Sequence, residues 1–390
     1  MDFTVIFYIS LALLGAVLIL NIKKQPEGEK SFFDRILSKE IQGFLALFII
    51  FHQTVITLIH FGMTGDQMKE FYNYFYYGIL AVAFFFFSSG FGLVKRWMTD
   101  GNYTKGFMKR RTFTVLVPFF ICNYIYLIDA QLGNIIYGSS FTFTEVVCAF
   151  FGFFLVNNQM WFAVEIMILY VAFRLIFGRV KKAKTGILLM TAVVLIMIVI
   201  GFFSRHSESP VMSYWFKGEW WYNTILMFPL GMLYAYKEER INKIIKKAFL
   251  ALTLSSAVLL VILDYLHRQL MDMSIYYTEY DGSPHYMLDK LTALTEETLF
   301  EIVFIIFVIT IVSRLRIGNP ILRFFGKISL ETIMLNFLMS CKLLFLYERY
   351  GIAAYLPAVI ASTIVVASVV YLIKNFVLER RSGLFDGEVR

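Results

Sequence analysis

The chain has 390 residues, of which 59% are hydrophobic and 16% are charged, and its mean hydropathy is +0.69. Soluble globular domains contain about 45–50% apolar and about 25% charged residues, so this composition excludes an ordinary soluble enzyme, a disordered protein and a fibrous repeat. Three widely spaced cysteines exclude a disulfide framework and a cysteine metal cage, and we expect no metal site. The sequence therefore predicts an all-α protein that crosses a membrane many times.

Eleven apolar stretches are long enough to cross a bilayer, which takes about 20 residues of helix. The first lacks the basic leader and the small-residue cleavage site of a signal peptide, so we expect it to remain as a membrane helix. The apolar segment 143–156 is too short to cross, and we expect it to be interfacial or re-entrant on the outer face, while 267–296 forms the longest outer loop. The predicted spans lie near 4–22, 42–61, 73–95, 112–129, 160–177, 186–203, 222–237, 248–266, 297–313, 328–347 and 353–375.

The net charge of +8 is distributed unevenly along the chain. Of the 36 Lys and Arg residues, 29 lie in one set of alternate loops and 7 on the other side. Because basic residues are retained in the cytoplasm, we expect the first set inside, the N-terminus outside and the C-terminus inside. The basic segments are therefore topology signals rather than a nucleic-acid interface, and they cover 23–39, 95–111, 174–184, 237–247, 314–327 and 374–390.

A charge inside a span is costly, so each ionisable residue there is a functional candidate, and His52 and Glu165 are singled out here. His52 follows Gln42 by ten residues, which places it near the middle of the second span. A neutral imidazole there is suited to accept a proton from a hydroxyl as a general base, and equally to form a hydrogen bond that packs two helices. Glu165, in the fifth span, needs a cation, a polar side chain or its own proton as a partner.

Polar and aromatic residues also gather at the outer ends of later spans. Glu296, Glu297 and Glu301 occur at the outer start of the ninth span. They are suited to bind an acceptor or to orient a base, although a solvated helix start explains the first two equally well. The aromatic residues at 215 and 220–222 are suited to stack on sugar rings, and an interfacial aromatic belt is the alternative.

Short motifs follow one another in a fixed order between about residues 36 and 377. They are Gln-Gly at 42–43 with an apolar run to His52, Phe-Phe-Ser-Ser-Gly-Phe at 86–91, Phe-Met-Lys-Arg-Arg at 107–111 leading to Pro118, Met-Trp-Phe at 160–162, Trp-Trp-Tyr-Asn at 220–223 leading to Phe-Pro-Leu-Gly at 228–231, and the segment 325–331. This ordered set resembles the acyltransferase family 3, membrane proteins that O-acylate cell-surface glycans. The resemblance implies a ten-helix acyltransferase domain at 36–377, an added N-terminal helix and linker at 1–35, and a cytoplasmic tail at 378–390.

The histidine motif departs from the pattern of that family. There, a basic residue precedes the histidine by eleven positions, whereas here Gln42 replaces it and His52 follows at ten. The difference turns His52 about 80° away from the face of Gln42 on a regular helix. Either a π-bulge absorbs the shift and turns His52 inward, or Gln53, which cannot act as a base, occupies the place of the histidine. Thr114 and Asn336 are further departures.

The resemblance implies an enzyme of the cytoplasmic membrane that moves an acetyl or other short acyl group from cytoplasmic acyl-CoA to a hydroxyl of an extracytoplasmic glycan or lipid-linked sugar. His52 would be the base, with Gln53, Ser89 or Glu165 orienting it or stabilising the oxyanion. The same resemblance implies acyl-CoA contacts to the residues Lys109, Arg110, Arg111, Ser89 and Trp161; positive-inside retention alone also explains the three basic residues. The alternative is a non-catalytic relative that acts as a transporter, a sensor or a subunit of a glycan-assembly complex.

Overall fold

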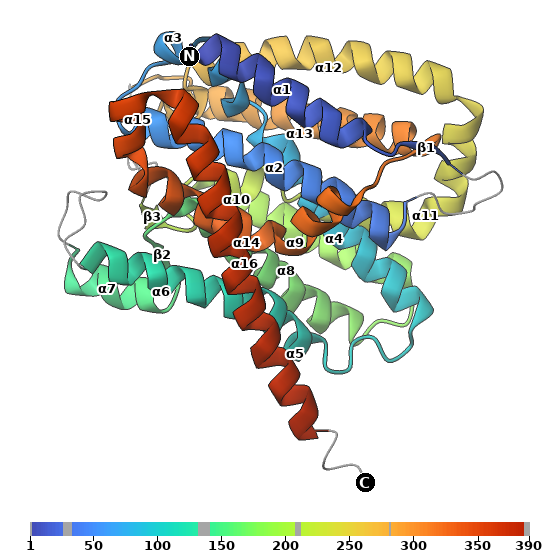
Figure 1. The fold of residues 1–390 in the computed structure, drawn as a ribbon. Helices are drawn as coiled ribbons and strands as arrows, with labels where there is room; N and C mark the ends of the chain where they lie inside the picture. Colours follow the sequence, from blue (N-terminus) through green and yellow to red (C-terminus); the bar gives the residue numbers. More distant parts are fainter. Residues whose placement is uncertain (1, 26–32, 132–140, 207–211, 281, 386–390) are drawn as a thin grey trace.

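The computed structural model describes residues 2–25, 33–131, 141–206, 212–280 and 282–385, with the side chains of 131 and 377–385 left aside. These residues form an almost entirely helical bundle (Figure 1). The helices are α1 (Phe3–Ile19), α2 (Arg35–His60), α3 (Gly65–Met68), η1 (Lys69–Phe75), α4 (Gly78–Thr99), α5 (Phe107–Arg111), η2 (Thr112–Leu116), α6 (Val117–Gln131), α7 (Phe143–Phe150), η3 (Asn158–Met160), α8 (Trp161–Phe177), α9 (Ala183–Phe203), α10 (Trp220–Asn223), α11 (Met227–Lys247), α12 (Phe249–Asp272), η4 (Ile275–Tyr277), α13 (Tyr286–Val312), α14 (Pro320–Lys342), α15 (Leu344–Tyr350) and α16 (Ile352–Phe385).

Within the described residues, seven helical segments are long and apolar enough to cross a membrane. An eighth results if α14 and α15, which meet at a 47° bend, form one broken span. This confirms the prediction of an all-helical membrane bundle. Three of the predicted spans coincide with helices outside this set: α1 has only 17 residues, and α11 and α13 carry several charged residues. The count of eleven crossings and the orientation stay predictions.

Two close helix crossings form the centre of the bundle. Gly43 of α2 lies against the backbone of α14, where a Cβ would overlap with the carbonyl oxygen of Leu322. Gly90 of α4 and Gly231 of α11 approach each other's helices in the same way. Small residues let helix backbones approach this closely in a membrane protein, where packing rather than burial from water drives association. The helices α2, α4, α11 and α14 therefore hold one another in fixed positions at the centre of the bundle.

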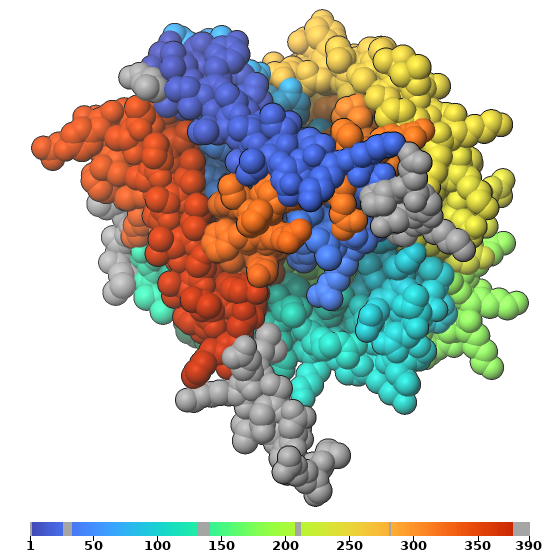
Figure 2. Space-filling view, turned by 45° about the vertical axis from the view of Figure 1, so that its right-hand side comes forward, coloured from blue at the N-terminus to red at the C-terminus, as the bar shows by residue number. Residues whose placement is uncertain are grey.

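The outer layers of the bundle differ in how much of their surface is covered. In the apolar window of the α3–α4 segment 72% of residues are buried, against 11% in that of α12. We conclude that α4 is a central helix and that α12 presents most of its surface to lipid. Figure 2 shows α1 on the surface, where Phe3, Ile6 and Leu14 pack in one cluster with Tyr355 and other residues of α16.

Short strands tie distant connections together in two places. The strand β1 (Lys23–Lys24), after α1, pairs antiparallel with β4 (Leu315–Arg316), which follows α13. The strand β2 (Phe154–Leu155) pairs antiparallel with β3 (Ser213–Tyr214). The second pair fixes the chain just before α8, because its residues directly precede the segment that carries Trp161.

The local structure corrects two expectations and agrees with a third. The helix α2 is α-helical throughout, so the bulge expected near His52 is absent; the π-helical turn of the described chain lies instead at η2, directly after Arg111. The expected loop 267–296 is much shorter, because α12 continues to Asp272 and α13 begins at Tyr286. The segment 143–156 contains only the eight-residue helix α7 and β2, both too short to cross a membrane.

Candidate functional site

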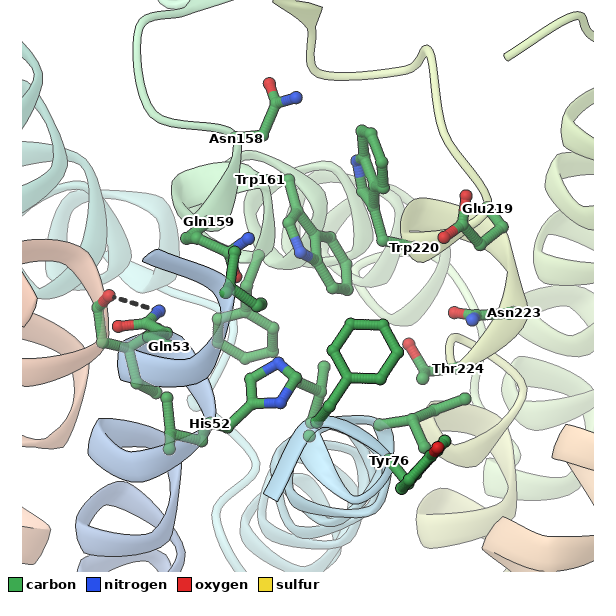
Figure 3. A pocket seen from close by; sticks show the side chains of 18 of the residues that line it. His52, Gln53, Tyr76, Asn158, Gln159, Trp161, Glu219, Trp220, Asn223 and Thr224 are labelled. Carbon is green, nitrogen blue, oxygen red and sulfur yellow. Dashed lines mark hydrogen bonds between the residues drawn. The ribbon is translucent and has the colours of Figure 1, made fainter. Parts of the chain in front are cut away.

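A cavity of about 200 Å³ lies among α2, η1, α4, α8, α10, α12, α13 and α14 (Figure 3). Most of its lining residues are apolar or aromatic, and the others are amides, carboxylates, a threonine and two histidines. Such a mixed cavity, with a few polar groups converging on one space, is the usual form of a small-molecule site. Its polar and Trp lining residues are His52, Gln53, Tyr76, Asn158, Gln159, Trp161, Glu219, Trp220, Asn223, Thr224, His267 and Glu297.

His52 is held in one tautomer by its backbone contact. Its Nδ1 lies 3.0 Å from the carbonyl oxygen of Tyr74, which can only accept a hydrogen bond, so Nδ1 carries the proton. The lone pair of Nε2 is therefore free in the neutral ring. Residue 78 is glycine, and a Cβ there would overlap with Nε2, Cε1 and Cδ2 of the imidazole. The absent side chain lets the Nε2 edge of the ring pack close to the backbone of residue 78, and both residues line the cavity.

Gln53 and Trp161 line the same cavity from opposite helices. The side-chain amide of Gln53 donates from Nε2 to the carbonyl oxygen of Ile333 in α14, at 2.9 Å, and only 1% of Gln53 is exposed. Trp161 begins α8, after a turn in which the Asn157 side chain accepts from the backbone N–H of Gln159. Figure 3 shows the ring of His52 below the indole of Trp161. The cavity is wide enough to be lined by both His52 and Gln53, although they are neighbours on a regular helix and point in different directions.

A second histidine lies in the wall of the cavity. In His267 of α12, Nε2 lies 3.0 Å from the carbonyl oxygen of Tyr76, and Nδ1 lies 3.0 Å from Oε2 of Glu296. Since Nε2 must donate to the carbonyl, Nδ1 either donates to the carboxylate as an imidazolium or accepts from a protonated Glu296. In both states His267 and Glu296 share a proton. His267 was not among the predicted site residues, because hydropathy placed it in a loop.

Carboxylates occupy the side of the cavity that α10 and α13 form. Oε2 of Glu297 accepts from the hydroxyl of Tyr276 at 2.5 Å and from Nδ2 of Asn223 at 3.1 Å. Oε2 of Glu219 accepts from the hydroxyl of Tyr277 at 2.8 Å. The two tyrosines lie in η4, outside the spans, and burial raises the pKa of both, so they stay protonated and donate.

Three other predicted site residues meet near α5, at the end of α4 away from Gly78. The hydroxyls of Ser89 and Tyr170 lie 2.9 Å apart, and the guanidinium of Arg111 lies 4.6 Å from the ring centre of Tyr170. Arg111 also donates to the hydroxyl of Tyr103 at 3.1 Å. Arg110 lies beside them, but its guanidinium donates to the backbone carbonyls of Tyr103 and residue 105, at 2.7 and 2.9 Å. Arg111 is therefore better placed than Arg110 to meet a ligand.

The structure does not gather all predicted residues in one place. His52, Gln53 and Trp161 line the cavity, whereas Ser89 lies further along α4 and Lys109, Arg110 and Arg111 lie in α5. Glu165 is fully buried in α8 and does not line the cavity, and neither of its carboxylate oxygens has a hydrogen-bond partner. Glu296 and Glu301 are likewise buried rather than solvated, which rules out the solvated helix start for Glu296. Among the described residues, no group of His, Cys, Asp and Glu is arranged to hold a metal ion.

Comparison with protein families gave one match. The model of the acyltransferase family 3, described as an acyltransferase domain, matches residues 41–373. These residues include every side chain of the cavity and of the group around Arg111. Comparisons with curated proteins and with solved structures gave no significant match.

Proposed function

Since this chain belongs to the acyltransferase family 3, we propose that it moves an acetyl or other short acyl group from cytoplasmic acyl-CoA to a hydroxyl of an extracytoplasmic glycan or lipid-linked sugar. The observation that carries the proposal is the hydrogen bond between Nδ1 of His52 and the carbonyl of Tyr74, which leaves Nε2 as a proton acceptor beside the cavity. We place the enzyme in the cytoplasmic membrane, with its acyltransferase domain at 36–377, an additional helix and linker at 1–35 and a cytoplasmic tail at 378–390.

The reaction needs one general base and transfers the acyl group in a single step. Nε2 of His52 takes the proton of the acceptor hydroxyl while the hydroxyl oxygen attacks the carbonyl carbon of the thioester. The carbon–sulfur bond breaks, the ester forms, and the CoA thiolate receives the proton from the imidazolium. The carbonyl of Tyr74 holds the ring through Nδ1 and stabilises the positive charge that develops on it. The buried amide of Gln53 borders the same space and is placed to stabilise the oxyanion.

The acyl donor enters from the cytoplasmic side in this proposal. Arg111, with Lys109 in the same turn, binds CoA phosphates, while Arg110 supports this turn through its hydrogen bonds to backbone carbonyls. Ser89 and Tyr170 border the path toward the cavity. The helix α4 connects the two sites, because Ser89 lies three helical turns, about 16 Å, from Gly78. The pantetheine arm of CoA would run along this helix to Trp161. Glu165 lies in α8 between Trp161 and Tyr170 and would border this path.

Transfer by the purified protein tests the proposal. The protein is reconstituted in liposomes with labelled acetyl-CoA on the side of the basic loops and methyl β-glucoside as a model acceptor on the other side. We expect labelled ester on the sugar, or labelled acetate where water replaces the sugar, at a rate that depends on protein. The function would be refuted if the protein shows a cooperative thermal unfolding transition, and so is folded, yet neither transfers nor hydrolyses the acetyl group of acetyl-CoA.

A further inference from the structure

The cavity wall opposite His52 is built from hydrogen-bond acceptors. The amide nitrogen of Asn223 donates to Glu297, which fixes the orientation of the amide. Its carbonyl oxygen then has no partner, although only 6% of Asn223 is exposed, and Figure 3 shows this amide turned toward the cavity. An unpaired buried acceptor costs about 1–3 kcal/mol, so it indicates a place for a ligand that donates a hydrogen bond.

This wall carries two carboxylates. Glu219 and Glu297 line the cavity, and each is held by a tyrosine hydroxyl that donates to it. No lysine or arginine is among the described residues that line the cavity. A ligand with its own carboxylate or phosphate would therefore meet these carboxylates with no lysine or arginine beside it, because the proton of His267, which also lines the cavity, is shared with Glu296.

A neighbouring cleft is also acidic. A polar cleft of about 680 Å³ shares Tyr76 with the cavity and is lined by Asp66, Glu70 and Asp272. The hydroxyl of Tyr76 donates to Asp272 at 2.6 Å. The one lysine in the described lining of the cleft, Lys69, is paired with Asp2 at 2.8 Å, so it does not reverse the charge of the cleft.

We propose that this acceptor-rich, acidic wall selects the acceptor, binding hydroxyl compounds that are uncharged or carry an ammonium group and rejecting anionic saccharides. The inference rests on the proposed function in that the bound compound is the acyl acceptor, but binding itself needs no acyl donor. Sugar hydroxyls or an ammonium group donate to the Asn223 carbonyl and to Glu219, whereas His52 lies on the opposite side to receive the reacting hydroxyl.

Three matched ligands test the proposal: methyl β-glucoside, its 2-amino-2-deoxy analogue and methyl β-glucuronide, which differ in charge. Trp161 and Trp220 line the cavity, so tryptophan fluorescence of the intact protein in detergent reports binding without acyl-CoA. We expect the glucuronide to bind at least about tenfold more weakly than the glucoside, and the amino sugar at least as tightly as the glucoside. Equal binding of the glucuronide, or no binding of any of the three, would overturn the proposal.

Two variants connect the selectivity to the wall. Glu219→Gln keeps an acceptor for Tyr277 and removes one charge, and we expect it to reduce the discrimination against the glucuronide several-fold. Glu297→Gln is the second variant if the first does not fold. Glu348→Gln removes a carboxylate from an exposed position that lines neither space and should leave the discrimination unchanged. Unchanged discrimination in folded Glu219→Gln and Glu297→Gln would refute the role of the wall. Charge-ordered binding without acetyl transfer would instead refute only the proposed function.

Discussion

Replacing Gly78 by alanine tests whether the Nε2 edge of His52 is the reacting edge. The added Cβ would lie closer than 3.0 Å to Nε2, Cε1 and Cδ2 of the ring, whereas ordinary contacts begin near 3.4 Å. Relieving this overlap requires the imidazole ring to move by about 1 Å, and a misplacement of that size lowers the rate about 10²-fold. The helix propensity of alanine, about 1 kcal/mol better than that of glycine, offsets part of the strain on folding.

The assay is the initial rate of acetyl transfer from labelled acetyl-CoA, with thermal unfolding of the same samples. We expect Gly78→Ala to lose about 100-fold in rate and to keep its affinity for acetyl-CoA, because the donor contacts lie at the other end of α4. Gly92→Ala is the matched control, since it lies on the same helix and its Cβ would meet no atom within 4 Å. A Gly78→Ala protein as active as Gly92→Ala would refute the assignment of Nε2 of His52 as the reacting atom.

Three further predictions concern other parts of the chain. Arg111→Gln should raise the KM for acyl-CoA by about tenfold or more, since a hydrogen bond to a charged group contributes about 1.5–3 kcal/mol. Arg110→Gln should change this KM little, because the Arg110 guanidinium donates to backbone carbonyls. Equal changes in the KM of the two variants, measured by titration with acyl-CoA, would contradict this. Burial lowers the pKa of His206, which lies in the loop after α9, so the unfolded state binds more protons as the pH falls below about 6.5 and stability is lost there. Thermal unfolding of His206→Gln should show a smaller loss of stability on acidification than wild type. Cysteines at Gly101 and Gly282, in a background without other cysteines, should be labelled by an impermeant maleimide from opposite sides of the membrane, Gly282→Cys from outside; the reverse pattern would invert the topology.

Hydropathy and charge predicted the membrane bundle, but they misplaced one outer end of it. Asp264, His267 and Arg268 interrupt the apolar pattern of the eighth span, so the sequence ends the helix there. In the structure α12 continues to Asp272, because Arg268 bonds to Asp264 one turn earlier and His267 bonds to Glu296. Such partners are 4 to 29 residues apart, and a hydropathy window does not detect them.

The candidate site was predictable where motifs carried it and not where partners came from distant segments. The motif order identified His52 and Trp161, which line one cavity. Helix periodicity indicated that either His52 or Gln53 faces the site, but the cavity is wide enough to be lined by both. His267 gave no signal in the sequence, because its role depends on the carbonyl of Tyr76, 191 residues away.

The central claim, that His52 acts as the base, is tested most directly by acetyl transfer in liposomes with His52→Gln. Glutamine can still donate to the carbonyl of Tyr74 but has no basic nitrogen. We predict a rate lower by about 10²–10⁴-fold, with acetyl-CoA affinity unchanged, because general-base catalysis contributes about that factor. A folded His52→Gln protein that transfers acetyl groups at close to the wild-type rate would contradict the claim.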